Sequence, residues 1–398
     1  MKRSPMLAIF LIAFVGMLGY GIIIPITPFY AKSFGASDTM IGLLIGSYAL
    51  AQFIAAPILG RLSDRFGRRP ILLLSIAGTI GSLLLFGQAD SMVLLFAGRL
   101  LDGATGGNIA IAQAYVADVT TEENRARGMG VIGAALGMGF IVGPAIGGFL
   151  SAGGNYQLPI FVAAGISFVS LLMTAVGLPE AKRQQAAVET QGRTSDLRRL
   201  WRGMRNPRIG RLLLVTLLIG LAFTAFETTF ALFAAARLEF GSMETGYTLA
   251  YIGIVIAVIQ GGLIRRLAKR YGEARLIVGG AALLGLGLLM LGFIADTWQL
   301  LAVGMVIAAG EGVLTPSLSS LVSRRSLPHE RGEHLGLYQS MGSIGRIAAP
   351  LTATWLLDRA GLAVPYLLGG ALVLAGAGVA LGLLRDEAPE PALAGQQA

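Results

Sequence analysis

Long apolar runs recur along the whole 398-residue chain and leave few folds open to it. Hydropathy divides the chain into twelve runs of about 20 residues, the length that an α-helix needs to cross about 30 Å of hydrocarbon. Charged residues make up only 13% of the chain, half of the roughly 25% in soluble domains. We therefore expect an all-α integral membrane protein with twelve transmembrane helices. The runs lie near residues 6–31, 38–60, 70–88, 92–117, 128–151, 158–178, 209–236, 246–264, 275–294, 298–322, 334–357 and 363–384.

The net charge of +9 belongs to the loops between these runs. If both termini are cytoplasmic, then Lys32, Arg237 and Arg359 are the lysines and arginines outside, and Arg99 and Arg346 lie within runs. All others face the cytoplasm, as the positive-inside rule requires. The basicity thus reflects membrane topology, and we expect no nucleic acid partner.

The residues that most enzymes use are scarce. The chain has no cysteine, and its two histidines, His329 and His334, share one charged loop. No GxxxxGK[ST] phosphate-binding motif is present, so ATP is not expected to be the energy source. We expect no catalysis, no metal site and no cofactor.

Two segments repeat at nearly the same offset, which indicates two related halves. GRLSDRFGRRP (60–70) has a degraded counterpart in RRLAKRYGEAR (265–275), and GMGFIVGPAIGG (137–148) in SIGRIAAPLTAT (343–354). Such internal repeats are typical of transporters built from two six-helix bundles. We predict pseudo-symmetric bundles at 1–178 and 209–385, a cytoplasmic linker at 179–208 and a disordered tail at 386–398. Within the linker, LRRLWRGMR (197–205) can form a helix on an anionic membrane surface or be part of a flexible connection.

With these motifs in order, the chain resembles the major facilitator superfamily, and within it the twelve-helix drug/proton antiporters. LGYGIIIPITPFY (18–30), GRLSDRFGRRP, GRLLDGATGG (98–107) and GPAIGG (143–148) carry the resemblance, the last being similar to the antiporter signature. AYVADVT (114–120) resembles tetracycline exporters, but Gly16 replaces their buried aspartate and the eighth run lacks their histidine. The resemblance therefore favours multidrug relatives in a bacterial inner membrane, each acting as a monomer.

Two of these motifs imply conformational roles. The loop 60–70 places an acid among arginines between glycines that allow a tight turn; the resemblance implies a cytoplasmic gate latch centred on Asp64, and the alternative is a purely topogenic basic loop. The proline and glycines of the fifth run suit a kinked, closely packed helix, with packing alone as the alternative. The expected gate residues are Gly60, Asp64, Arg65, Gly67, Arg68, Gly143, Pro144, Gly147 and Gly148.

Five charged residues lie inside apolar runs. Each costs about 2.5–3.5 kcal/mol to insert at a bilayer centre, so such residues usually face cavities and act in function. Arg99 and Asp102 can pair at i,i+3, whereas Glu227 and Glu311 have no basic residue one helical turn away. We predict Glu227, Glu311 and Asp102 as proton-coupling residues and Arg99 and Arg346 as their charge partners. A permanent pair between a glutamate and Arg346 is the main alternative.

Aromatic and amide side chains accompany these charges and predict an amphipathic substrate pocket. Aromatic rings beside a carboxylate suit lipophilic cations, although a single aromatic ring in such a run more often contacts lipid or the core. Gln113 shares the face of Arg99 and Asp102 in a helix, whereas Asn108 does not. The predicted pocket residues are Tyr20, Gln113, Phe223, Phe226, Phe230, Tyr251, Gln260, Tyr338 and Gln339.

The sequence thus favours a proton-driven exporter of amphipathic, cationic or zwitterionic drugs that works by alternating access. The proton gradient is the expected energy source, and the drug, protons and the lipid bilayer are the expected partners. Export of an endogenous metabolite, siderophore, sugar or lipid would need the same architecture. An intramembrane enzyme would need a nucleophile with its base or a metal cluster within the runs. A receptor or scaffold would leave the buried acids unexplained.

Overall fold

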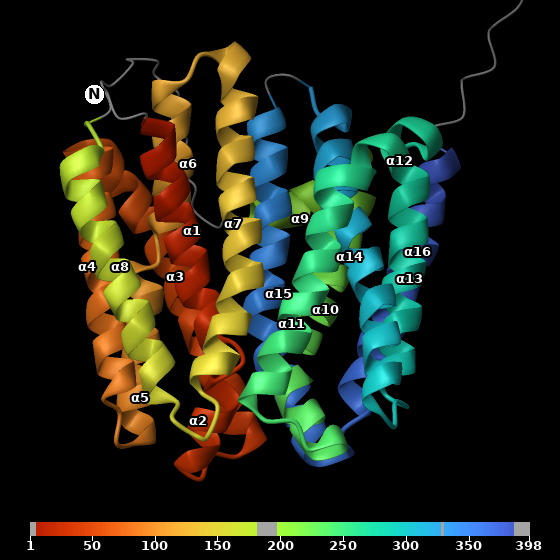
Figure 1. Cartoon of the computed structure of the whole chain (residues 1–398). Helices are drawn as coiled ribbons and strands as arrows, with labels where there is room; N and C mark the ends of the chain where they lie inside the picture. Colours follow the sequence, from red (N-terminus) through yellow and green to blue (C-terminus); the bar gives the residue numbers. More distant parts are fainter. Residues whose placement is uncertain (1–4, 181–196, 328–329, 386–398) are drawn as a thin grey trace, which may run out of the picture.

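The computed structural model describes residues 5–180, 197–327 and 330–385, and its regular elements within those ranges are helices (Figure 1). The predicted disordered tail lies outside the described residues, as does most of the linker. The helices of the first half are α1 (Pro5–Ile23), α2 (Thr27–Ser33), α3 (Asp38–Phe66), α4 (Arg68–Gly87), α5 (Met92–Thr105), α6 (Asn108–Val119), α7 (Glu122–Leu150) and α8 (Gln157–Gly177). Then come α9 (Leu197–Arg205), α10 (Gly210–Leu238), α11 (Ser242–Val258), the π-helix η1 (Ile259–Leu263), α12 (Ile264–Tyr271), α13 (Glu273–Leu291), α14 (Thr297–Arg325), α15 (Arg331–Ala360) and α16 (Val364–Arg385).

Ten stretches of the described chain are long and apolar enough to cross a membrane, counting α11, η1 and α12 as one. The two other predicted spans depart from the simple pattern for identifiable reasons. The fourth is broken at Gly106–Gly107 into α5 and α6, each too short to cross alone. The eleventh, α15, is 30 residues long, but Arg346 and its polar neighbours lower its hydropathy.

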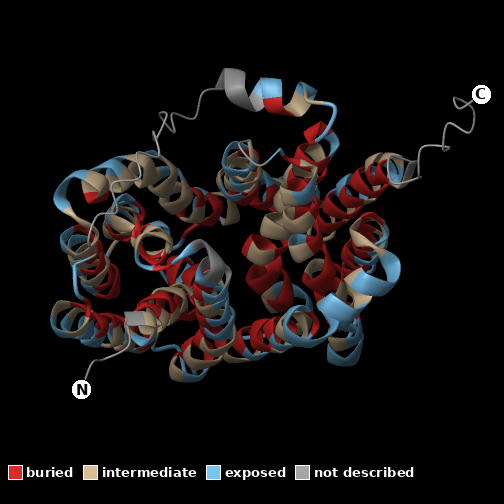
Figure 2. Cartoon of the chain, turned by 90° about the horizontal axis from the view of Figure 1, so that it is seen from above, coloured by how far each residue is buried: buried red, intermediate tan, exposed pale blue. Residues whose placement is uncertain are grey.

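The helices gather into two groups, seen end-on in Figure 2. α1 packs on α7 and α8, and α4 on α5 and α8; in the second half, α13 packs on α14 and α16, and α10 on α15 and α16. One large apolar core fills the second group, and two smaller cores fill the first. The groups meet along α7 against α11 and along α3 against α15. We call them the first and second bundle.

Close contacts between the bundles lie far from the two basic loops, 60–70 and 265–275, which mark what we call the basic end. Thr39 Oγ1 donates to Asp358 Oδ2 at 2.9 Å, and the Ser151 and Ser242 hydroxyls lie 2.7 Å apart. A Cβ on Gly42 would collide with Pro350 and Thr354, and one on Gly148 would lie 2.7 Å from the Ser242 carbonyl oxygen. Small residues therefore let the bundles join at the end opposite the basic one.

Helix α9 occupies the part of the predicted linker that the structure describes. Trp201 is exposed, with the Arg205 guanidinium 5.1 Å from its ring centroid. On the other side Met204 packs on Leu213 and Leu337. This segment is thus helical, which is one of the two alternatives that its sequence leaves open, and it rests on α10 and α15.

Candidate functional site

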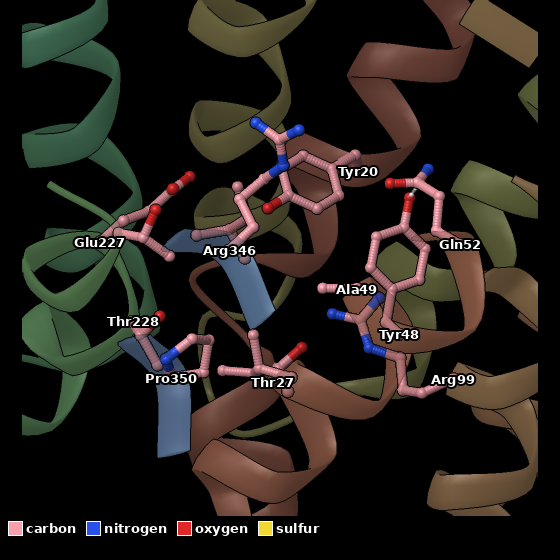
Figure 3. A pocket seen from close by; sticks show the side chains of 13 residues that line it. Tyr20, Thr27, Tyr48, Ala49, Gln52, Arg99, Glu227, Thr228, Arg346 and Pro350 are labelled. Atoms are coloured by element: carbon pink, nitrogen blue, oxygen red, sulfur yellow. Dashed lines mark hydrogen bonds between the residues drawn. The ribbon is translucent and has the colours of Figure 1, made fainter. Parts of the chain in front are cut away.

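A cavity lies between the bundles and is lined from both of them. Its walls are built by α1, α2, α3 and α5 of the first bundle and by α10 and α15 of the second (Figure 3). The lining residues are Tyr20, Ile24, Thr27, Ile45, Tyr48, Ala49, Gln52, Arg99, Thr224, Glu227, Thr228, Arg346 and Pro350. The wall thus mixes apolar surface with hydroxyls, one amide and three charged side chains.

Tyr48 and Gln52 form a wall that the sequence analysis missed. They stand one turn apart on α3, where the helix passes the break between α5 and α6. Gln52 Nε2 lies within hydrogen-bond distance of the Gly106 carbonyl oxygen, at 2.9 Å, and of the Tyr48 hydroxyl, at 3.0 Å. A Cβ at Gly103 would clash with the Tyr48 carbonyl, so only glycine lets α3 approach this closely. The sequence signal that could have identified them is the spacing of two polar residues at i,i+4 within an apolar run.

Arg99 lies almost entirely buried on the same wall, with its side chain 4% exposed. Its guanidinium carbon is 5.2 Å from the Tyr48 ring centroid and 5.5 Å from that of Phe86. The predicted partner Asp102 is 3.8 Å from Nη1, which is beyond hydrogen-bond distance. Arg99 Nε and Nη1 have no hydrogen-bond partner among the described residues. The predicted pair therefore forms a loose ion pair that leaves donors of Arg99 unused.

Glu227 and Arg346 come from the second bundle and reach the same cavity. Glu227 lies on α10, and Arg346 on α15 donates from Nη2 to Ser343 Oγ at 2.9 Å. In Figure 3 the Arg346 side chain lies between those of Glu227 and Tyr20. Within the described residues, neither takes part in an ion pair shorter than 4.0 Å. The permanent Glu–Arg346 pair considered above is thus not formed in this conformation.

Glu311 lies away from this cavity wall, on α14. The Thr315 hydroxyl donates to its Oε1 at 2.5 Å, while Oε2 is buried without a partner among the described residues. The Tyr338 hydroxyl is 3.4 Å from the Thr315 carbonyl oxygen, so α14 and α15 meet beside this acid. Glu311 and Tyr338 therefore belong to a neighbouring polar cluster within the second bundle.

The predicted aromatic residues divide between cavity and core. Tyr20 lines the cavity, with its ring centroid 6.0 Å from that of Tyr48. Phe226 and Phe230 are 2% and 0% exposed and pack against each other with tilted rings inside the second bundle. Phe223 is half-buried and packs on Phe226, outside the set that lines the cavity.

The remaining predicted pocket residues also lie outside that set. The Tyr251 hydroxyl donates to the Leu301 carbonyl at 3.3 Å and thereby ties α11 to α14. Gln113 is half-buried on α6, and Gln260 and Gln339 are exposed. A linear pattern locates the helix that carries a residue, but the rotation of that helix decides whether the side chain meets the cavity.

The basic loop 60–70 is held by ion pairs inside the first bundle. Arg68 Nη1 is 2.6 Å from Asp64 Oδ1, and Arg68 Nε is 2.8 Å from Asp118 Oδ2 on α6. Gly67 has φ of +100°, a backbone conformation that favours glycine, and it separates α3 from α4. Gly60 and Arg65 lie on the last turns of α3, where Arg65 stacks on Phe66. The predicted latch residues are thus assembled, with Asp64 paired to Arg68.

GPAIGG lies where α7 contacts both α1 and α11. A Cβ on Gly143 would lie 2.8 Å from the Gly21 Cα, and one on Gly147 would collide with Ile22. On the other face, Gly148 meets Gly246 of α11, with Pro144 one turn away. The predicted close packing is present, and it joins α7 to both bundles.

Comparison with known proteins agrees with this architecture. The family model of the Major Facilitator Superfamily matches residues 9–269 and again 262–398. The chain is 34% identical to the tetracycline resistance protein, class E, of Escherichia coli, over 89% of this chain and 88% of that one. It is 30% identical to multidrug resistance protein 2 of Bacillus subtilis, over 92% of each.

A solved transporter structure also matches the fold of this chain. The human organic anion transporter MFSD10 superposes with a TM-score of 0.71 at 26% identity, covering 94% of this chain and 98% of that one. The chain is therefore a multi-pass membrane transporter, not an enzyme, and belongs to the Major Facilitator Superfamily.

Proposed function

We propose that the chain is a proton-driven exporter of amphipathic drugs that works as a monomer in a bacterial inner membrane. The observation that carries the proposal is Glu227, a carboxyl group on the wall of a cavity enclosed by both bundles and without an ion-pair partner among the described residues. A carboxyl group removed from water favours its neutral form, so such a group can take up and release a proton as the cavity changes its exposure. The tetracycline and multidrug resistance proteins named above support drugs as the cargo.

The proposed cycle alternates between two closures of the bundles. The described conformation joins them at the end opposite the basic loops. With both termini and the basic end in the cytoplasm, this is the state that takes up drug from inside. Opening outward then lets protons bind Glu227 and Glu311 and displace the drug, and the protonated carrier returns. The gradient is the only energy source in this scheme, with no bound cofactor.

Transport by the purified protein in liposomes with an imposed pH gradient tests the proposal. Ethidium, norfloxacin and tetracycline are the test compounds, and wild type is compared with Glu227→Gln and Glu311→Gln. Glutamine keeps the shape of the side chain but cannot exchange a proton, so gradient-driven movement should be lost in at least one variant. Glu239→Gln is the matched control, because Glu239 is exposed at the end of α10.

Three results would contradict the proposal. Full pH-dependent transport by both glutamine variants would exclude these acids as the coupling groups. No movement of any of the three drugs by folded wild-type protein would exclude drug export and favour an endogenous substrate. Movement that ignores the gradient would exclude proton coupling.

A further inference from the structure

The charges on the cavity wall are unbalanced. Arg99 and Arg346 contribute two guanidinium groups, and Glu227 contributes the one carboxyl group among the lining residues. Uptake of a proton by Glu227 would leave the cavity more positive still. A purely cationic ligand would therefore meet two like charges, whereas an anionic group would find a partner.

Of the two arginines that line the cavity, Arg99 is the one with buried N–H groups that have no hydrogen-bond partner among the described residues. Its side chain is 4% exposed, and Nε and Nη1 lack hydrogen-bond partners among the described residues. A buried charge without hydrogen bonds is costly, and such groups are normally satisfied by a partner or a ligand. Asp102 at 3.8 Å supplies charge but no hydrogen bond.

The surroundings of Arg99 hold its guanidinium in place without using its N–H groups. Tyr48 and Phe86 contact it through their ring faces, which attract a cation through the quadrupole of the ring. Gln52 lies within hydrogen-bond distance of the Tyr48 hydroxyl, so the ring is itself fixed. A planar guanidinium presented in this way matches a carboxylate, which accepts two parallel N–H bonds.

We propose that Arg99 is an anion subsite of the cavity, and that the ligands of this chain are amphipathic compounds bearing a carboxylate or a similar planar anionic group. The inference rests on the proposed function for its view of the cavity as the drug site. A zwitterion fits the same walls best, since its cationic end can face Glu227 of the second bundle while its acid meets Arg99 of the first (Figure 3).

Equilibrium dialysis of the purified full-length chain tests this inference with norfloxacin, a zwitterion with a carboxylate, and its ethyl ester. The two compounds share their ring system and amine and differ in the acid. Charge-assisted hydrogen bonds to Arg99 should make the acid bind roughly tenfold more tightly than the ester. Arg99→Gln should abolish that preference, and Arg99→Lys, which keeps the charge but loses the planar fork, should reduce it.

Arg359→Gln is the control, because Arg359 is exposed at the end of α15 and its loss changes net charge equally. It should retain the full preference. Equal wild-type affinities for acid and ester, or a preference that survives in Arg99→Gln, would overturn the subsite. If Arg99→Gln fails to fold, Arg99→Lys provides the test, because an undiminished preference for the acid in the lysine variant would equally overturn the subsite.

Binding needs no gradient, so this test is separate from that of the exporter. A preference for the acid that depends on Arg99, without gradient-driven transport, would support the subsite and contradict the proposed function. Gradient-driven ethidium movement without any preference for the acid would support the exporter and overturn the subsite.

Discussion

A single polar residue within the apolar run of α3 can stabilise the fold through its hydrogen bonds. Gln52 lies within hydrogen-bond distance of the Gly106 carbonyl oxygen, which the break between α5 and α6 leaves without a helical partner. The amide therefore stabilises both the broken helix and the Tyr48 side of the cavity.

Gln52→Leu should lower the free energy of unfolding by about 0.5–1.5 kcal/mol, because it removes a half-buried hydrogen bond to the Gly106 carbonyl. The measurement is thermal unfolding of the purified protein in detergent. Gln260→Leu is the control, since Gln260 is exposed in η1 and its loss should change stability little. Equal effects of the two substitutions would show that the bond to Gly106 contributes nothing.

At the scale of the elements, α7 and α11 form one of the two helix contacts that join the bundles at the closed end. A Cβ at Gly246 would clash with the Pro144 carbonyl and lie 2.9 Å from the Gly148 Cα. Both partners are backbone, so neither can move aside without shifting a helix. The close approach of α7 and α11 at the closed end therefore requires glycine at position 246.

Gly246→Val should weaken that closure and impair drug transport. Overpacking costs about 1–3 kcal/mol, which would shift a two-state equilibrium by roughly tenfold to a hundredfold. Gly137→Val is the control, because a Cβ at this exposed position of α7 meets nothing within 4 Å. Transport rates in liposomes measure the effect, and wild-type rates in Gly246→Val would contradict this role of the crossing.

The sequence predicts the helices better than the cavity, for a physical reason. Length and hydropathy decide which segments enter lipid, so the helical bundles and the motif contacts of Asp64 and Gly148 follow from local pattern. The cavity wall depends on how each helix is rotated against its neighbours. That rotation buries Phe226 and Phe230 in the core and brings Tyr48 and Gln52 to the wall.

For the whole molecule, alternating access requires that the closed end open once in every cycle. The Ser151 and Ser242 hydroxyls lie 2.7 Å apart across the two bundles, and the chain contains no cysteine. Replacing both serines with cysteine places the only two thiols of the protein at this contact. Sulfur atoms in place of these two oxygens would need only a small shift to reach the S–S distance of about 2.05 Å in a disulfide.

Oxidation of the Ser151→Cys, Ser242→Cys double variant should trap the described conformation and stop transport, and reduction should restore it. The fraction of cross-linked protein is read from its mobility on gels and compared with transport in the same liposomes. Each single-cysteine variant serves as the control, since oxidation leaves it without a cross-link and its transport should not change. A covalent bond between α7 and α11 prevents the two helices from separating. Full transport by completely cross-linked protein would therefore mean that the bundles do not part at this end. The rocking cycle proposed for this chain would then be wrong.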